Sequence, residues 1–145
     1  MTSAFDINEV IRRLGLEPHP EGGHYRRTWA HPTEVDGRPL ASSIIYLLTR
    51  GERSHWHRID AVEQWHHYAG DPLQLCIADA DQSSFTAHVL GGDVLRGQLP
   101  QHVVPEGRWQ SALAMGDWSL VGCTVTPAFS FDGFELAPAG WEPGT

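Results

Sequence analysis

Short apolar segments separated by turn residues run along most of the chain, and this rhythm limits the fold more than any other feature. Segments with strand character lie at 24–31, 41–49, 62–69, 73–79, 85–90, 101–104, 109–114 and 118–126. Within one of them, Leu73, Leu75 and Ile77 alternate with smaller or more polar residues, which is the period of two expected of a strand. Short strands with turns every ~8–12 residues are typical of a β-sandwich or barrel rather than a parallel α/β sheet. We therefore expect an all-β fold.

One short helix is predicted before the first strand. Asp6 and Glu9 have the D-x-x-E spacing of a capping box, and apolar residues recur from Ile7 to Leu14 at the spacing of one helix face. Gly15 is placed to end the helix in a left-handed conformation. No repeat, linker or low-complexity block follows, so residues 1–145 are predicted to form a single domain.

The charged residues exclude several classes of function. The formal net charge is −8, which argues against nucleic acid or an anionic membrane as a partner. All ten basic residues are Arg, so the chain has no lysine for a Schiff base or for a Walker A motif, and we expect no organic cofactor. Nine His and the carboxylates are left to supply the chemistry.

The N-terminal stretch, the lengths of the apolar runs and the two cysteines together predict a cytoplasmic protein. The N-terminal stretch has no basic segment followed by an apolar core, so no signal peptide is expected. No apolar run approaches the ~18–20 residues that a membrane helix needs. Cys76 and Cys123 both lie in apolar segments, which favours two buried thiols over a disulfide framework.

The densest chemical information lies in the segment 51–70. His55 and His57 are two residues apart, so on a regular strand both point to one face, roughly 6–7 Å apart. Glu63 begins the next strand, and a hairpin through 58–62 would bring it beside them. Two His and one carboxylate can hold a divalent first-row metal with open positions. Two alternatives remain, which are a metal-free polar pocket and a purely structural cluster.

Four stretches of the chain resemble a known family. They are PHPEGGHYR (18–26), SHWHRIDAVEQWHHYAGDPLQL (54–75), QHVVPEGRWQ (101–110) and LVGCTVTPAFSFDGFEL (120–136). The first two motifs of the cupins are recognisable in them, and together they are similar to the small cupin family Cupin_5, also called DUF985. Ala128 departs from the family pattern, which usually has Gly there. The resemblance covers about residues 14–137.

The resemblance implies a small cupin jelly-roll β-barrel, usually a homodimer, with a small-molecule ligand or substrate in its pocket. At the place where many cupins carry a third metal-binding His, this sequence has Gln110. The implied metal ligands are then His55, His57, Glu63 and Gln110, around one ion of Fe, Ni, Mn or Zn. The family has no generally established reaction, and the fold alone does not assign one.

Further candidate residues flank this set. If Glu63 points into the barrel, strand alternation sends Trp65 and His67 the same way, which makes Trp65 a ligand contact and His67 a general base or a support for one. Arg26 and Glu21 are candidates for ligand binding, with surface ion pairs as the alternative. Phe129, Phe131 and Phe134 are expected to form a flap over apolar surface.

Three functions are compatible with this pocket. The first is a metal-assisted isomerase or epimerase of a sugar-like or carboxylated metabolite, in which His67 or Glu63 moves the proton. The second is a cupin that binds or senses a metabolite without turnover. The third is a metal-dependent dioxygenase, so whether the protein is an enzyme stays open.

Overall fold

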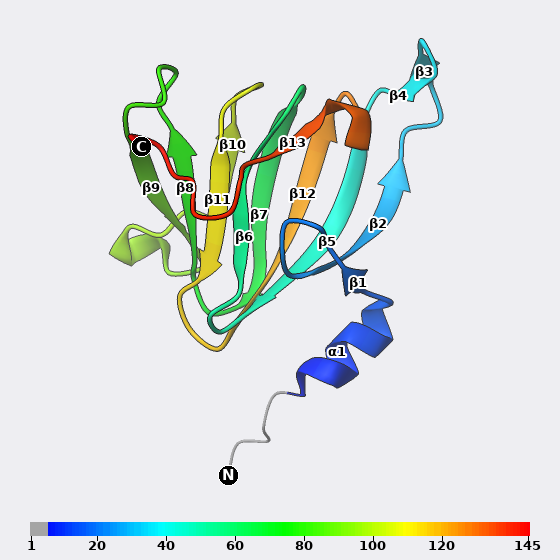
Figure 1. Cartoon of the computed structure of the whole chain (residues 1–145). Coiled ribbons are helices and arrows are strands. Elements are labelled where there is room, and N and C mark those ends of the chain that lie inside the picture. The colour runs from blue at the N-terminus through cyan, green and yellow to red at the C-terminus, as the bar shows by residue number, and fades with distance from the viewer. Residues whose placement is uncertain (1–5) are drawn as a thin grey trace.

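The computed structural model describes residues 6–145, and its helix begins and ends as predicted. Helix α1 spans Ile7–Leu14 and lies beside the β-structure (Figure 1). The Asp6 side chain accepts a hydrogen bond from the Glu9 backbone N–H at 3.2 Å, and Gly15 follows with φ of 66°. Among the described residues, no helix is both long and apolar enough to cross a membrane.

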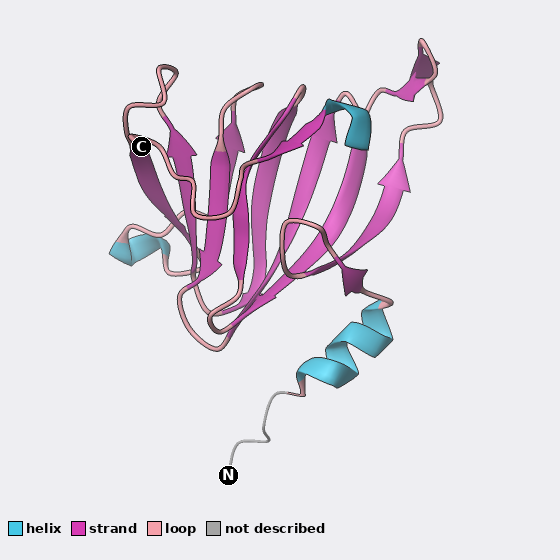
Figure 2. Cartoon of the chain, in the orientation of Figure 1, coloured by secondary structure: helices cyan, strands magenta, loops and turns pink. Residues whose placement is uncertain are grey.

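Two antiparallel sheets contain all the strands of the described residues except β3 and β4 (Figure 2). The six-stranded sheet contains, in order of neighbours, β1 (Glu17–Pro18), β2 (His24–Ala30), β5 (Ser42–Thr49), β12 (Trp118–Thr126), β7 (Val62–Gly70) and β10 (Gln101–Val104). The five-stranded sheet contains β13 (Phe134–Leu136), β6 (Arg53–Ile59), β11 (Gln110–Ala114), β8 (Leu73–Ala78) and β9 (Phe85–Leu90). All the predicted strands are present, so the all-β prediction is confirmed.

The connections add three small elements. The predicted loop 32–39 contains a short hairpin, in which β3 (Glu34–Val35) pairs with β4 (Arg38–Pro39). Its turn is Asp36-Gly37, and both residues have positive φ, at 53° and 78°. Two 3-10 turns, η1 (Val94–Arg96) and η2 (Phe131–Gly133), complete the chain.

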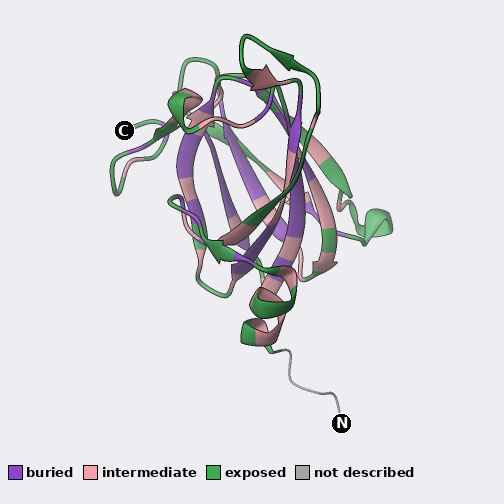
Figure 3. Cartoon of the chain, turned by 90° about the vertical axis from the view of Figure 1, so that its right-hand side faces the viewer, coloured by how far each residue is buried: buried purple, intermediate pink, exposed green. Residues whose placement is uncertain are grey.

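The core lies between the two sheets, and strands of both sheets carry buried residues (Figure 3). Tyr46 and Trp65 come from the six-stranded sheet and are fully buried against Leu75 of the five-stranded sheet. A second cluster packs Trp56 and Trp109 on the outer side of the five-stranded sheet. The residues of the inner cluster are almost all apolar. A site for a polar ligand therefore has to lie beyond the edge of this cluster.

The core makes a testable prediction about stability. Leu75 is 0% exposed, and Leu75→Ala should lower the free energy of unfolding by about 2–5 kcal/mol because it leaves a cavity. Leu95 is 100% exposed, so Leu95→Ala is the matched control and should leave the urea midpoint close to that of the wild type. Equal losses in the two variants, measured by urea unfolding, would contradict this packing.

Candidate functional site

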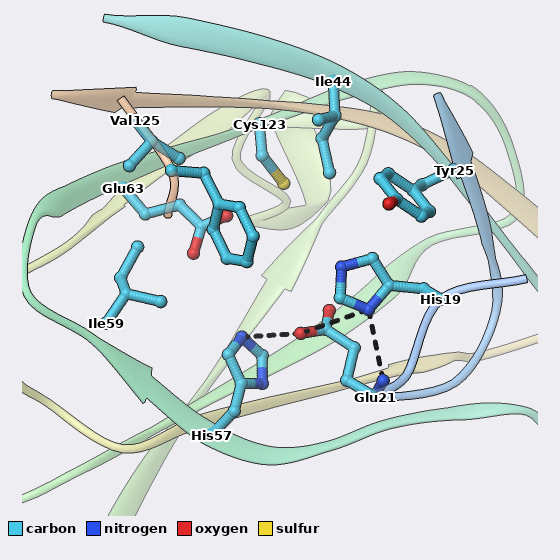
Figure 4. A pocket seen from close by; sticks show the side chains of 10 residues that line it. His19, Glu21, Tyr25, Ile44, His57, Ile59, Glu63, Cys123 and Val125 are labelled. Carbon is cyan, nitrogen blue, oxygen red and sulfur yellow. Dashed lines mark hydrogen bonds and ion pairs between the residues drawn. The ribbon is translucent and has the colours of Figure 1, made fainter. Parts of the chain in front are cut away.

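Polar and apolar side chains together line a small, largely enclosed cavity (Figure 4). Its lining residues come from the 19–25 segment, both sheets and the segment after β12, and they are His19, Glu21, Tyr25, Ile44, His57, Ile59, Glu63, Cys123, Val125 and Phe129. The space open to the centre of a water molecule is about 20 Å³. That is room for one or two waters.

A bulge in β6 decides which of its side chains reach the cavity. Opposite β11, His57 pairs with Gln110 and Ser54 pairs with Ala112, so β6 carries one residue more than its partner between these positions. The extra residue breaks the alternation of the strand. Ser54 and His57 are therefore both buried on the inner side, whereas Trp56 packs in the outer cluster.

The segment before β2 is folded tightly onto the barrel by two glycines. Gly22 and Gly23 have φ of 111° and 80°, which L side chains rarely adopt. A Cβ on Gly22 would lie 2.1 Å from the Arg53 carbonyl oxygen, so the backbone of the segment lies directly against β6. The His55 N–H donates to the Glu21 carbonyl at 2.7 Å and ties the same contact. This packing turns the Glu21 side chain into the cavity.

Glu21 and His57 form a buried pair. His57 Nε2 lies 3.1 Å from Glu21 Oε2, and the two side chains are 3% and 6% exposed. The other ring nitrogen, Nδ1, lies 2.8 Å from the His55 carbonyl and donates to it, because a carbonyl can only accept. Neutral His57 therefore turns an unprotonated Nε2 toward Glu21. A hydrogen bond between them needs one proton, held by either the carboxyl group or the imidazole.

Glu21 has further polar neighbours besides His57. Ser54 donates to Glu21 Oε1 at 2.8 Å. His19 Nδ1 accepts from the Glu21 backbone N–H at 3.1 Å, so this nitrogen is unprotonated and neutral His19 carries its proton on Nε2. The His19 ring is buried among aromatic rings, with Tyr25 at 4.4 Å between centroids and Phe129, Phe131 and Phe134 at 6.3, 6.4 and 6.3 Å.

Glu63 enters the cavity from β7 and is held by a chain of neutral groups. Gln110 Nε2 donates to Glu63 Oε1 at 2.8 Å, and Trp65 Nε1 donates to Gln110 Oε1 at 2.8 Å. Gln110 and Trp65 are both fully buried. Gln110 therefore orients the carboxyl group through hydrogen bonds, and Trp65 belongs to the core and does not line the cavity.

Burial shifts the pKa values of these groups in the direction that favours their uncharged forms. Desolvation raises the pKa of Glu21 and of Glu63, and it lowers the pKa of His57 and of His19. The pKa of the Cys123 thiol is also raised by burial, so it carries no thiolate nucleophile. Carboxyl groups with raised pKa beside imidazoles with lowered pKa suit proton exchange near neutral pH.

Three candidate residues lie elsewhere. His55 follows the outward side of the bulge, where its Nε2 lies 3.0 Å from the Pro138 carbonyl. His67 Nε2 lies 2.9 Å from the Asp71 carbonyl, farther along β7 and away from the cavity lining. The Arg26 guanidinium donates to the Leu14 carbonyl at 3.2 Å. None of the three residues lines the cavity, so the roles expected for His55, His67 and Arg26 stay predictions.

The predicted metal set does not come together. His55 faces away from His57, and the Gln110 amide is engaged on both sides by Trp65 and Glu63. The polar residues that do meet Glu21 and His57 are joined to one another by hydrogen bonds. Among residues 6–145, no group of three or more His, Cys, Asp and Glu side chains is arranged to hold a metal ion. The donor set of this cavity fits proton transfer better than metal ligation.

Sequence reasoning missed His19 as a cavity residue. It lies five residues before the first long strand and belongs to no ligand spacing. The available signal was the glycine pair in H-P-E-G-G, because two adjacent residues with positive φ mark a segment pressed against another backbone. Phe129, expected in a flap, does line the cavity, and Phe131 and Phe134 pack beside it.

Comparisons with known proteins agree with this architecture. Residues 8–137 match the model of the family Cupin_5, which is described as Cupin superfamily (DUF985). The protein SO0799 from Shewanella oneidensis, known from a crystal structure, is 39% identical in sequence to this chain. The two structures have a TM-score of 0.86, and the match covers 92% of this chain and 85% of that one. A hypothetical protein from Leishmania major is 32% identical, with a TM-score of 0.82 over 92% and 88%.

A more distant likeness shows the fold alone. Oxalate decarboxylase from Bacillus subtilis is 14% identical, with a TM-score of 0.63 over 82% of this chain and 29% of that one. None of the curated proteins compared with the chain matches it.

The buried carboxyl of Glu63 predicts a pH-dependent stability difference. Burial raises its pKa above the usual 4.5, so the folded protein holds a proton that the unfolded chain releases first. The contribution of Glu63 to the free energy of unfolding therefore falls as the pH rises from the unfolded-state pKa to the folded-state pKa. Glu63→Gln keeps an acceptor for Gln110 and removes this titration. The variant should thus gain stability relative to the wild type between pH 4.5 and pH 8.

Urea unfolding at both pH values measures that difference, at about 1.4 kcal/mol for each unit of pKa displacement. Glu106→Gln, which removes an exposed carboxylate, is the control for the loss of one surface charge. A Glu63→Gln advantage that shrinks as the pH rises would contradict the burial of an ionisable carboxyl at this position.

Proposed function

This chain belongs to the Cupin_5 (DUF985) family of the cupin superfamily. On that basis we propose that it is an isomerase or epimerase of a small polar molecule. The reaction class is proton transfer at a carbon next to a carbonyl group. The observation that carries the proposal is the buried pair of Glu21 and His57, 3.1 Å apart, on the wall of a cavity that Glu63 also lines.

The base in this proposal is His57. Its Nδ1–H is held by the His55 carbonyl at 2.8 Å, which fixes the tautomer with an unprotonated Nε2. Its lowered pKa keeps the imidazole neutral near pH 7. When a substrate takes the place of the Glu21 carboxyl group in front of Nε2, this nitrogen can accept a proton from substrate carbon. Glu21 lies beside the same nitrogen and stabilises the imidazolium that forms.

The acid in this proposal is Glu63. Burial raises its pKa, so this carboxyl group holds a proton at a higher pH than an exposed glutamate does, and the Gln110 amide holds the group in place. As the C–H bond breaks toward His57, the electron pair forms a carbon–carbon double bond, and the carbonyl oxygen takes the proton of Glu63. Return of the proton from His57 to the other face of the same carbon, with the new hydroxyl giving its proton back to Glu63, gives the epimer. Protonation of the neighbouring carbon instead, with the other hydroxyl losing its proton to Glu63, gives the isomer. No oxidant or second substrate is needed.

Binding requires movement at the mouth of the cavity. Space for one or two waters is too small for a substrate of several heavy atoms, and Phe129 lines the cavity beside Phe131 and Phe134. Their rings contact one another and His19 but make no polar contact that holds them. A shift of these side chains is the least costly way to admit a ligand.

The test is solvent deuterium incorporation into small hydroxyaldehydes and hydroxyketones, followed by NMR in D2O. Wild-type protein should exchange the hydrogen next to the carbonyl of at least one of them. His57→Gln and Glu21→Gln should each slow that exchange by roughly 10²–10⁴-fold, which is the range for a positioned acid or base.

His55→Ala is the matched control, because this side chain lies outside the cavity lining. It should keep most of the wild-type rate. A loss in His55→Ala as large as that in His57→Gln would contradict the assignment of the base. Ligand binding without exchange in the wild type would replace catalysis with the non-catalytic binding function.

A further inference from the structure

The charges around the cavity restrict what it can accept. Two carboxyl groups, Glu21 and Glu63, line it together with the imidazoles of His19 and His57 and the phenol of Tyr25. None of the ten arginines is among the lining residues of the described chain, and the sequence contains no lysine. The cavity therefore has two groups that can become negative and no permanent positive charge.

Arg27 lies near this end of the barrel and lines a separate surface pocket with Phe129, not the cavity itself. Two further arginines near this end are engaged elsewhere. Arg38 donates to both carboxylate oxygens of Asp60, at 3.0 and 2.8 Å, and to the Ala128 carbonyl at 2.7 Å. Arg58 donates to Glu135 at 2.9 Å and lies 4.7 Å above the ring of Trp109, on the outer side of the barrel. Neither is free to neutralise an anion inside the cavity.

The polar atoms of the cavity match a hydroxyl or carbonyl group. A hydroxyl can donate to a carboxylate oxygen and accept from a protonated ring nitrogen or phenol, so it satisfies partners of both kinds. A carboxylate or phosphate only accepts, and it would lie beside Glu21 or Glu63 in a site that leaves room for few screening waters. The remaining wall is apolar, with Ile44, Ile59 and Val125, and suits the C–H face of the same small molecule.

We infer that the substrate class of this cavity is the uncharged hydroxycarbonyl compounds, and that carboxylated and phosphorylated analogues are excluded. This inference rests on the proposed function, because it narrows the substrate of the same proton transfer. Glu21 and Glu63 are then specificity-determining residues in addition to their roles beside the reacting carbon. Of the two substrate types expected from the sequence, sugar-like and carboxylated, it selects the uncharged sugar-like one.

The experiment compares matched pairs that differ by one ionised group. Glyceraldehyde is set against glycerate and glyceraldehyde 3-phosphate, and erythrose against erythronate and erythrose 4-phosphate. Binding to the wild-type protein is measured by ligand-observed NMR and by the shift in melting temperature at pH 7.5. We expect the uncharged member of at least one pair to bind at least tenfold more tightly than its anionic partners.

Glu63→Gln tests the cause of this selectivity. It removes one ionisable group and keeps the acceptor for Gln110, so the ratio between uncharged and anionic ligands should fall severalfold. Glu106→Gln, with its exposed carboxylate, should leave that ratio unchanged. A ratio that is the same in Glu63→Gln as in the wild type would overturn the role assigned to Glu63.

The outcomes separate this inference from the proposed function. Equal or tighter binding of the anionic members overturns the inference, and deuterium exchange into such an anion would leave the proton-transfer function standing. Selective binding of the uncharged members without any exchange supports the inference and overturns the catalytic proposal. Failure of every member of the panel to bind overturns the inference.

Discussion

The site depends on the extra residue that β6 carries opposite β11. Between Ser54 and His57 the register shifts by one, so two residues that are three apart in sequence share the inner face. Ser54 can then donate to Glu21 Oε1 while His57 lies against Oε2 of the same carboxyl group. Without the bulge, His57 and Ser54 would point to opposite sides of the sheet, and Glu21 would be buried with only one of them.

Burial of carboxyl groups is costly, and the surrounding structure shows how the cost is limited. Glu21 and Glu63 each receive a hydrogen bond from a neutral side chain, Ser54 and Gln110, and neither has an arginine partner. Their pKa values rise as a consequence, so part of the cost is met by holding a proton. An arginine would have stabilised the carboxylates but left them permanently ionised. The choice of neutral partners is therefore what makes these groups able to give and take protons.

The sequence predicted the elements better than the positions of side chains within them. The helix, the strands and the cupin family follow from local spacing and from motifs that cover most of the chain. The direction of His55 does not, because alternation assumes an unbroken strand and the bulge depends on pairing with residues more than fifty positions away. His67 lies away from the cavity for a different reason. It shares the strand of Glu63 but lies four residues farther along it, beside the Asp71 carbonyl.

Long-range contacts also explain the other differences. Gln110 does meet Glu63, as an amide that orients the carboxyl group, and only the position of Trp65 reveals that its oxygen is already engaged. Ala128 is buried and its N–H donates to the Pro39 carbonyl at 3.0 Å, which holds the start of the Phe129 segment over the cavity. None of these contacts has a signature in local spacing.

The 18–23 segment supplies what distinguishes this cavity within a widespread fold. A barrel of β6, β7 and β12 alone would offer His57, Glu63 and Cys123, which is an acid and a base without the carboxyl group that faces Nε2 of the base. Gly22 and Gly23 allow the backbone of the segment to lie against β5 and β6, closer than any Cβ permits, and Glu21 and His19 enter the cavity as a result. The likeness to oxalate decarboxylase, at 14% identity, concerns the barrel and not the chemistry within it. The reactivity of this protein therefore arises where a short segment outside the barrel strands meets the bulged strand, and an account of its chemistry has to begin at that contact.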